Sequence, residues 1–364
     1  IDPLALTRHV LWLAFAFGGL FGVVAQRTHF CTMGAVADIV SMGDWARLRM
    51  WVLAIAVAVL GFNTMVALGW VQAGNTLYAG PRMAWLSLVL GGALFGFGMV
   101  IASGCGSRNL VRLGGGNLKS LVVLIVLGLA GFATLKGITG SLRVATVDRL
   151  VVALPHGQDL PSLLAAGTGA GAPSIAAWLG PLVAALLVAW VLWRPEGRRP
   201  SVWLGGVGVG AVVVGLWWVS GTVGHLTEDP RTLEEAFLAT NSHRMESLST
   251  VAPIAYGLDW LLYFSDASQT LSFGIVTMLG IVLGAAASAL VSHSFRLEGF
   301  GNTSDLAHHL VGATLMGVGG VTALGCSIGQ GLSGLSTLSV GSMLALAAIL
   351  GGTWLGLRYQ EWRL

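Results

Sequence analysis

Long apolar runs dominate this chain and alternate with short polar connections. A membrane-spanning helix needs about 17 to 25 predominantly apolar residues. By that criterion nine runs qualify as spans, with approximate limits 10–25, 50–71, 84–102, 118–139, 174–193, 202–222, 271–291, 307–323 and 340–357. The pattern therefore predicts an all-α polytopic membrane protein with about nine transmembrane helices and short re-entrant or broken helices between them.

Three segments between the spans have distinct expectations. Residues 26–38, QRTHFCTMGAVAD, are too short and too mixed in polarity to cross, so we expect a re-entrant half-helix there. Irregular backbone at membrane depth must be satisfied by protein or a water-filled cavity, so such a segment usually borders a pathway. Residues 140–173 are expected to form an outer loop. The longest polar connection, 223–270, carries Trp260, Tyr263 and Phe264, which favour an interfacial helix.

One short pattern occurs twice. Residues 91–105 read GGALFGFGMVIASGC and residues 312–326 read GATLMGVGGVTALGC, so a shift of 221 superposes Gly91 on Gly312 and Cys105 on Cys326. With nine spans the two copies run in opposite directions, as in secondary transporters whose sites lie where broken helices meet. We therefore expect one transmembrane domain, 1–364, with inverted-repeat halves 1–193 and 202–364 around a central pathway, joined by a loop at 194–200.

Composition supports this class. Hydrophobic residues make up 55% of the 364 positions and charged residues 10%, and the mean hydropathy is +0.80, which excludes an ordinary soluble domain. The 53 glycines suit closely packed membrane helices. The net charge of +3 is not gathered in a basic tail or patch, so no nucleic-acid partner is expected.

The positive charges predict an orientation. If the C-terminus is cytoplasmic, the inner side holds Arg47, Arg49, Arg108, Arg112, Lys119, Arg194, Arg198, Arg199, Arg296, Arg358 and Arg363. The outer side then holds Arg8, Arg82, Lys136, Arg143, Arg149, Arg231 and Arg244. Cytoplasmic loops carry the excess of Lys and Arg, so the N-terminus is expected outside and the C-terminus inside.

The three cysteines, Cys31, Cys105 and Cys326, each follow an apolar run at a break. None belongs to a CxxC pair and their number is odd, so a structural disulfide framework is not expected. A cysteine can simply be a small buried apolar residue. Because all three cysteines lie at breaks between apolar runs, however, a role in contacting a ligand is favoured. Thiols and free N–H groups at a helix start together suit a sulfur-containing anion.

Residues beside the cysteines are candidate ligand contacts. Gly104 and Gly325 form the repeated Gly-Cys pairs, and Ser327 and Gln330 follow the last cysteine at a plausible half-helix start. Arg27 would either attract anions, pair with Asp38 or cap backbone carbonyls.

Other polar residues nearby have plainer explanations. For Arg108 and Arg112, inner-surface topology is favoured over ligand contact. His29 has no second His or Cys at ligand spacing, and His308 and His309 are expected at an interface. No metal or cofactor site is expected.

Three stretches, QRTHFCTMG (26–34), GFGMVIASGC (96–105) and LMGVGGVTALGCSIGQG (315–331), resemble the cysteine motifs of the YeeE/YedE family of bacterial inner-membrane sulfur transporters. SHSFR (292–296) is also similar to that family. The resemblance implies thiosulfate uptake without enzymatic activity, with Cys31, Cys105 and Cys326 handing the ion inward. It also implies a cytoplasmic sulfurtransferase of the TusA type as a partner, here a separate chain.

Alternatives concern both substrate and class. The run after Cys105, GSRNLVRLGGGNLKS, is more charged than in thiosulfate importers of that family, so sulfite, a sulfur-bearing organic anion or a selenium compound remain alternative substrates. A membrane thiol oxidoreductase would usually need paired thiols and a redox partner. A subunit that only recruits a sulfurtransferase is the third class.

Overall fold

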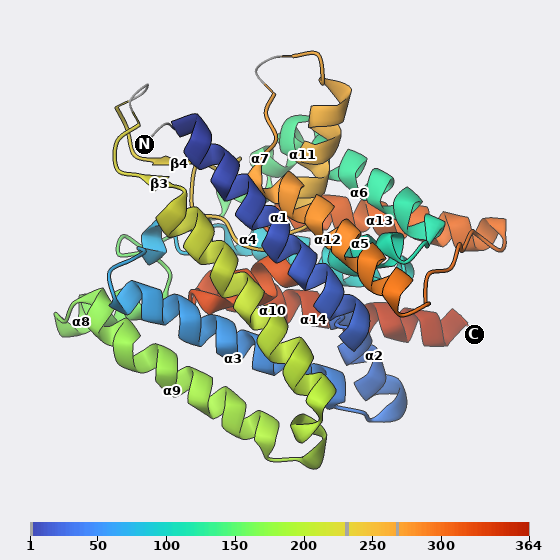
Figure 1. Ribbon diagram of the computed structural model, residues 1–364, viewed down its shortest axis with the longest axis horizontal. Helices are drawn as coiled ribbons and strands as arrows, with labels where there is room; N and C mark the ends of the chain where they lie inside the picture. Colours follow the sequence, from blue (N-terminus) through green and yellow to red (C-terminus); the bar gives the residue numbers. More distant parts are fainter. Residues whose placement is uncertain (1–2, 230–232, 267–268, 364) are drawn as a thin grey trace.

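The computed structural model describes residues 3–229, 233–266 and 269–363 (Figure 1). Arg231, which we expect on the outer side, lies outside these ranges. Helices make up most of the described chain. The strands have two residues each: β1 (Arg82–Met83) pairs with β2 (Val152–Ala153), and β3 (His225–Leu226) pairs with β4 (Ala236–Phe237).

A long helix forms at each of the nine predicted spans. These helices are α1 (Pro3–Thr28), α3 (Ala46–Ala67), α4 (Trp85–Ile101), α6 (Leu118–Lys136), α9 (Ala172–Leu192), α10 (Pro200–Trp218), α12 (Phe273–Val291), α13 (Thr303–Thr322) and α14 (Val340–Arg363). Within the described ranges, eight helical stretches are long and apolar enough to cross a membrane. The span predicted at 307–323 is not among them, because α13 begins with polar turns that include Asp305, His308 and His309. The all-α polytopic class is confirmed.

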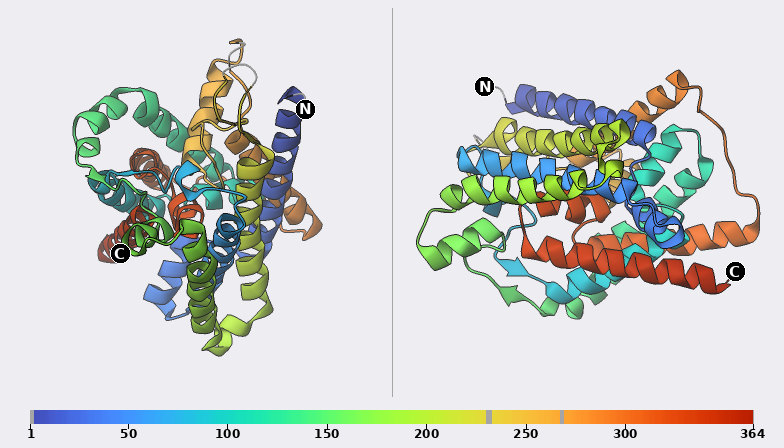
Figure 2. Two further views of the ribbon diagram at one scale, coloured as in Figure 1. Left: turned by 90° about the vertical axis from the view of Figure 1, so that its left-hand side faces the viewer. Right: turned by 90° about the horizontal axis from the view of Figure 1, so that it is seen from below.

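The long helices run roughly along one direction. The N-terminus and C-terminus lie at opposite ends of the bundle, on the left and right of Figure 1 and again in the right-hand view of Figure 2. Helix α1 packs against α12 and α10, α3 packs against α9 and α10, and α4 packs against α13 and α14.

The two copies of the repeated pattern pack directly on each other as α4 and α13. Their contacts are antiparallel, since Gly91 approaches Ala323 while Gly312 approaches Ala102. A Cβ at Gly91 would lie 2.5 Å from the Ala323 nitrogen, and one at Gly312 would lie 2.6 Å from the Ala102 nitrogen. The glycines therefore permit a backbone approach that no side chain allows. The antiparallel arrangement predicted for the copies is confirmed.

Short helices fill the space between the spans. They are α2 (Thr32–Met42), α5 (Gly106–Gly114), α7 (Ile138–Ala145), α8 (Leu160–Thr168) and α11 (Val251–Leu262), with 3₁₀ turns η1 (Ala73–Asn75), η2 (Val147–Arg149) and η3 (Pro195–Arg198) and π turns η4 (Val219–Val223) and η5 (Gly329–Gly334). The segment expected to be an outer loop, 140–173, thus contains most of α7 and all of α8. Helix α11 contains Trp260, ends just before Tyr263 and Phe264, and packs its buried residues on α6 and α12.

Candidate functional site

The three cysteines follow three breaks of one geometry. Two positions before each cysteine lies a residue in the left-handed conformation: His29 (φ 53°), Ser103 (φ 57°) and Leu324 (φ 56°). One N–H then bonds back to a carbonyl five residues earlier, from Phe30 to Ala25, Gly104 to Met99 and Gly325 to Gly320. This bond closes a helix in the manner of a Schellman motif. The break before Cys31 therefore has the same backbone geometry as the breaks before Cys105 and Cys326, although the sequence repeat relates only the latter two.

Each cysteine then begins a new helical segment. The Cys31 Sγ accepts a hydrogen bond from the Gly34 N–H at 3.3 Å, and the Cys326 Sγ accepts one from the Gly329 N–H at 3.3 Å. Cys105 precedes α5, and its Sγ lies 3.2 Å from the Ser107 Oγ. Since the sulfur lone pairs of Cys31 and Cys326 receive N–H groups, their S–H groups remain available as donors. The free N–H groups of these helix starts also favour an anion.

The thiols form a short series through the molecule. The side chains of Cys31 and Cys105 are neighbours. At the third break the Thr250 Oγ1 donates to the Cys326 Sγ at 3.2 Å. Thr250 also reaches the other break, because a Cβ at Gly106 would lie 2.8 Å from its Oγ1. All three cysteines are free thiols and are buried.

Two buried hydroxyls stand immediately after cysteines. Ser327 is fully buried, and its side chain lies beside the Cys105 thiol. Within the described part of the chain, no group meets the Ser327 Oγ with the distance and angle of a regular hydrogen bond. Thr32, after Cys31, is 2% exposed, and its Oγ1 likewise has no partner within that part. Leaving a buried hydroxyl unpaired costs free energy, so these two groups are suited to receive a ligand.

Gln330, a predicted ligand contact, is engaged with the protein. Its Nε2 donates to the Ala323 carbonyl at 2.6 Å, and its Oε1 accepts from the Ser342 Oγ at 2.7 Å. Asn109, the residue 221 positions earlier, also donates its Nδ2 to a break, at the Gly104 carbonyl (3.0 Å). The two side-chain amides therefore stabilise the backbone at the two breaks by satisfying carbonyl groups that the helices leave unpaired. Gly325 lies against Gln330, since a Cβ there would meet the Gln330 Cγ at 3.1 Å.

Arg27 is exposed near the end of α1. The pair suggested between Arg27 and Asp38 is wrong, because the Asp38 Oδ2 lies 2.9 Å from the Arg47 Nε. Gly43 explains the difference. It ends α2 in the left-handed conformation (φ 68°), and the chain turns back so that the start of α3 lies beside α2.

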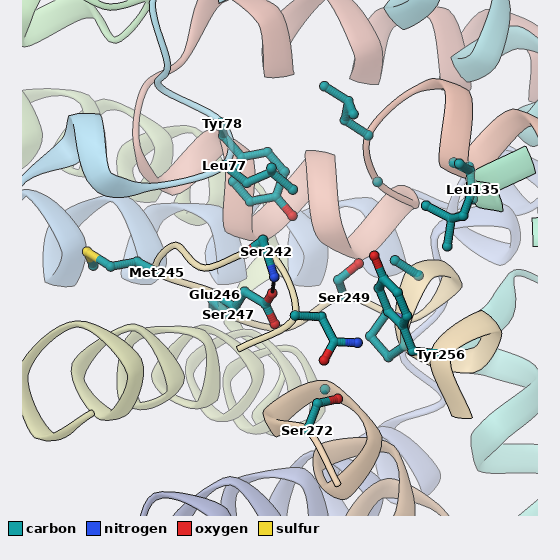
Figure 3. Close-up of a pocket in the computed structure, with 18 of the residues that line it drawn as sticks. Leu77, Tyr78, Leu135, Ser242, Met245, Glu246, Ser247, Ser249, Tyr256 and Ser272 are labelled. Atoms are coloured by element: carbon teal, nitrogen blue, oxygen red, sulfur yellow. Dashed lines mark hydrogen bonds between the residues drawn. The ribbon is translucent and has the colours of Figure 1, made fainter. Parts of the chain in front are cut away.

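A cavity that we name the Glu246 vestibule adjoins the third break. Its lining includes Tyr78, Glu246, Ser249, Tyr256 and Gly325. In Figure 3 the hydroxyls of Tyr78, Ser249 and Tyr256 point into the same space, near Glu246. Desolvation raises the pKa of Glu246 above its ordinary value, while hydrogen bonds from neighbouring residues oppose the shift. This vestibule adjoins the helical segment that begins at Cys326, because Tyr78 and Gly325 line it and a Cβ at Gly329 would lie 3.2 Å from the Tyr78 hydroxyl oxygen.

A second cavity, the Arg108 vestibule, lies among the turns that follow α1, α5 and α12. It is lined by Gln26, His29, Ser103, Arg108, Arg112, Gly115, Asn117, Lys119, Ser294, Arg296, Glu298, Asp305 and His309. Four of these side chains are cationic and two are acidic. The cysteines thus stand between a cavity rich in hydroxyls and a cavity rich in positive charge.

Several site residues could not be identified from the sequence. Thr250 precedes a short apolar helix, which is a recognisable capping signal, but nothing in its sequence resembles the Cys31 motif. Tyr78 and Glu246 lie in irregular connections with no periodicity to indicate where they fold.

Comparison with known proteins gives a consistent result. A family model described as Sulphur transport matches residues 27–355. A protein of Spirochaeta thermophila named thiosulfate transporter TsuA is 27% identical over 361 residues, covering 95% of this chain and 97% of the relative. A thiosulfate transporter TsuA of Escherichia coli is 27% identical over 348 residues, covering 93% and 91%. A probable transporter YedE of Salmonella typhimurium is 35% identical over 108 residues, covering 30% and 25%.

Proposed function

The chain belongs to the Sulphur transport family, and from this premise we propose that it carries thiosulfate across the bacterial inner membrane into the cell. The substrate follows from the two full-length relatives that are named thiosulfate transporters. The observation that carries the mechanism is the placement of three buried thiols, each at the start of a helical segment, between two vestibules.

The chemistry of the breaks suits this ion. Thiosulfate has a soft terminal sulfur and three oxygens that share its charge, and burying such a dianion is costly unless its hydration is replaced. Helix-start N–H groups and the hydroxyls of Ser327 and Thr32 offset the lost hydration at the oxygens. The thiols contact the terminal sulfur. The ion moves from Cys326 to Cys105 and Cys31 without a covalent step.

The distribution of charge indicates the direction in which the ion crosses the membrane. The Arg108 vestibule faces the cytoplasm in the orientation that places the C-terminus inside, because the segments around it carry the excess of positive residues. The Glu246 vestibule is then the outer entrance. A TusA-like sulfurtransferase would receive the ion on the inner side. Sulfite, which lacks a terminal sulfur, would use the thiols less well.

Uptake by the purified protein in liposomes tests the proposal. Radiolabelled thiosulfate should accumulate with the wild-type chain, and the variant with all three cysteines replaced by Ala should fall to the protein-free rate. Uptake by the purified chain would also exclude recruitment of a sulfurtransferase as its sole role. Equal uptake by wild type and the cysteine-free variant would refute the relay.

The adjacency of Cys31 and Cys105 favours thiol redox chemistry as the second candidate function. Mass spectrometry of the protein during uptake separates the two. Thiols that stay reduced through turnover support non-covalent passage, whereas a Cys31–Cys105 disulfide that cycles with an added reductant would support the redox reading.

A further inference from the structure

Arg108 stands between the thiols and the Arg108 vestibule. It lies in the first turn of α5, three residues after Cys105, and is partly buried. Its side chain lies against the break before Cys105, since a Cβ at Gly104 would lie 3.2 Å from the Arg108 Cγ, and it lies near the thiols of both Cys31 and Cys105. Arg108 lines the vestibule together with His29. The positive-inside rule accounts for a surface arginine, but not for a partly buried one that lies near two buried thiols.

The charge of Arg108 is uncompensated. Across the described ranges its side chain makes no hydrogen bond or ion pair. The two acids that share its vestibule are engaged elsewhere: the Asp305 Oδ2 lies 2.7 Å from the Lys119 Nζ, and the Glu298 Oε2 accepts from the Asn117 Nδ2 at 2.7 Å.

The adjacent arginine is used differently. The Arg112 Nη1 donates to the Ser103 carbonyl at 2.6 Å and so fixes the break before Cys105. Arg112 therefore has a structural partner, whereas Arg108 does not. A partly desolvated guanidinium without a partner is unfavourable unless an anion offsets it.

We propose that Arg108, Cys31 and Cys105 form an anion-binding site at the cytoplasmic end of the pathway, selective for a doubly charged sulfur oxyanion. The inference rests on the proposed function and deepens it. The guanidinium presents a fork of N–H donors that matches two oxygens of such an ion. The two thiols contact its terminal sulfur, and the unpaired Thr32 hydroxyl stands beside Cys31.

This site gives the ion a reason to leave Cys326. Attraction between opposite charges is several times stronger at a partly buried position than in water. The ion is therefore drawn toward Cys105, and beyond Arg108 it meets Arg112, Lys119 and the solvent of the vestibule. A singly charged anion gains less from the same guanidinium, and so the site distinguishes ions by charge.

Site-resolved thiol labelling tests the inference without requiring transport. Iodoacetate and iodoacetamide are similar in size but differ in charge, so their rate ratio at one thiol reports the local potential. With peptide mass spectrometry, the ratio at Cys31 should fall about fivefold or more in Arg108→Gln and stay near wild type in Arg108→Lys. Arg199→Gln is the matched control, because it removes one exposed inner-side charge outside the vestibule.

Thiosulfate protection completes the test. Thiosulfate should slow iodoacetamide labelling of Cys31 in wild type and in Arg199→Gln, but not in Arg108→Gln, and singly charged thiocyanate should protect less. Liposome uptake at low thiosulfate should fall about tenfold in Arg108→Gln. An unchanged labelling ratio and unchanged protection in folded Arg108→Gln would overturn the site. If the wild type takes up no thiosulfate, the proposed function fails even where the labelling result supports the site.

Discussion

The helices α1 to α6 and the helices α10 to α14 follow one another in a similar order, but the side chains at their breaks differ. In the first half the order is α1, α2, α3, α4, α5, α6, and in the second it is α10, α11, α12, α13, the helical segment after Cys326, and α14. Cys31 caps α2 beside Cys105, and Thr250 precedes α11 beside Cys326. Thr250 therefore takes the place of a fourth cysteine, so one half offers two thiols and the other a thiol and a hydroxyl.

The surroundings of the two breaks differ as well. The Arg108 vestibule beside the first pair is lined by four cationic side chains, whereas the lining of the Glu246 vestibule beside the second is mainly apolar, with several hydroxyls, one carboxyl group and a single cation, Arg143. A symmetric framework with asymmetric charge lets an anion experience different potentials at the two ends. In the proposed function, the helices around the breaks form the pathway. The residues that differ between the two breaks, such as Cys31 and Thr250, and the charges of the two vestibules determine the direction of transport.

The largest expected effect on thiosulfate uptake comes from replacing Cys105 or Cys326, the two cysteines that the sequence repeat relates. Cys105→Ala and Cys326→Ala should each lower liposome uptake about 10- to 100-fold, since a hydrogen bond to a charged group contributes about 1.5–3 kcal/mol. The initial rate of thiosulfate uptake measures this. If uptake fell in only one of the two variants, Cys105 and Cys326 would not have equivalent roles.

The next effect in size is expected on the stability of the fold, when a side chain is added at the contact between α4 and α13. Gly312→Ala places a Cβ against the Ala102 backbone, and overpacking of this kind costs about 1–3 kcal/mol. Thermal unfolding in detergent should show the loss, with Gly351→Ala on α14 as control, because nothing lies within 4 Å of a Cβ there. Equal stability of the two variants would contradict the close antiparallel contact.

A smaller effect is expected at Thr250. Thr250→Val keeps the shape but removes the donor to Cys326, and a neutral hydrogen bond contributes about 0.5–1.5 kcal/mol. Uptake should fall a few-fold, Thr250→Ser should restore it, and Cys31→Ala should cost a similar factor. Full activity of Thr250→Val would mean that the hydroxyl is only a packing group.

The smallest effect is expected from pH. The raised pKa of Glu246 means that the folded protein holds this proton to higher pH than the unfolded chain, so stability declines as pH rises through that window. Uptake should decline in the same direction, because the carboxylate repels an entering anion. His243, Arg143, Tyr78 and Tyr256 surround this carboxyl group.

Glu246→Gln is the matched variant for this prediction. It should keep the low-pH uptake rate and lose part of the decline at higher pH. Parallel pH profiles of wild type and Glu246→Gln would assign the decline to another group.

Much of the fold could be predicted from the sequence, because spans depend on local apolar length and the repeat leaves identical residues such as Gly91 and Gly312. Boundaries were less accurate where helices extend over polar residues, as in α13. The limits of the halves at 194–200 stay a prediction, although the order of elements is consistent with them.

The site was predictable only in part. The cysteines are recognisable in the sequence because each follows an apolar run. Only the fold distinguishes Arg27 from Arg108, because the first is exposed and the second is partly buried near two thiols. The partner of Asp38 depended on a turn at Gly43 that brings Arg47 close. Thr250 matches Cys31 in place but not in sequence, and only the fold relates them.

A structure determined with thiosulfate present tests the central claim most directly. The account predicts density for the ion between the two vestibules, with its terminal sulfur in contact with the Sγ of Cys326 or of Cys105 and its oxygens facing helix-start N–H groups. Density confined to the protein surface, with all three sulfurs remote from the ion under saturating thiosulfate, would contradict it.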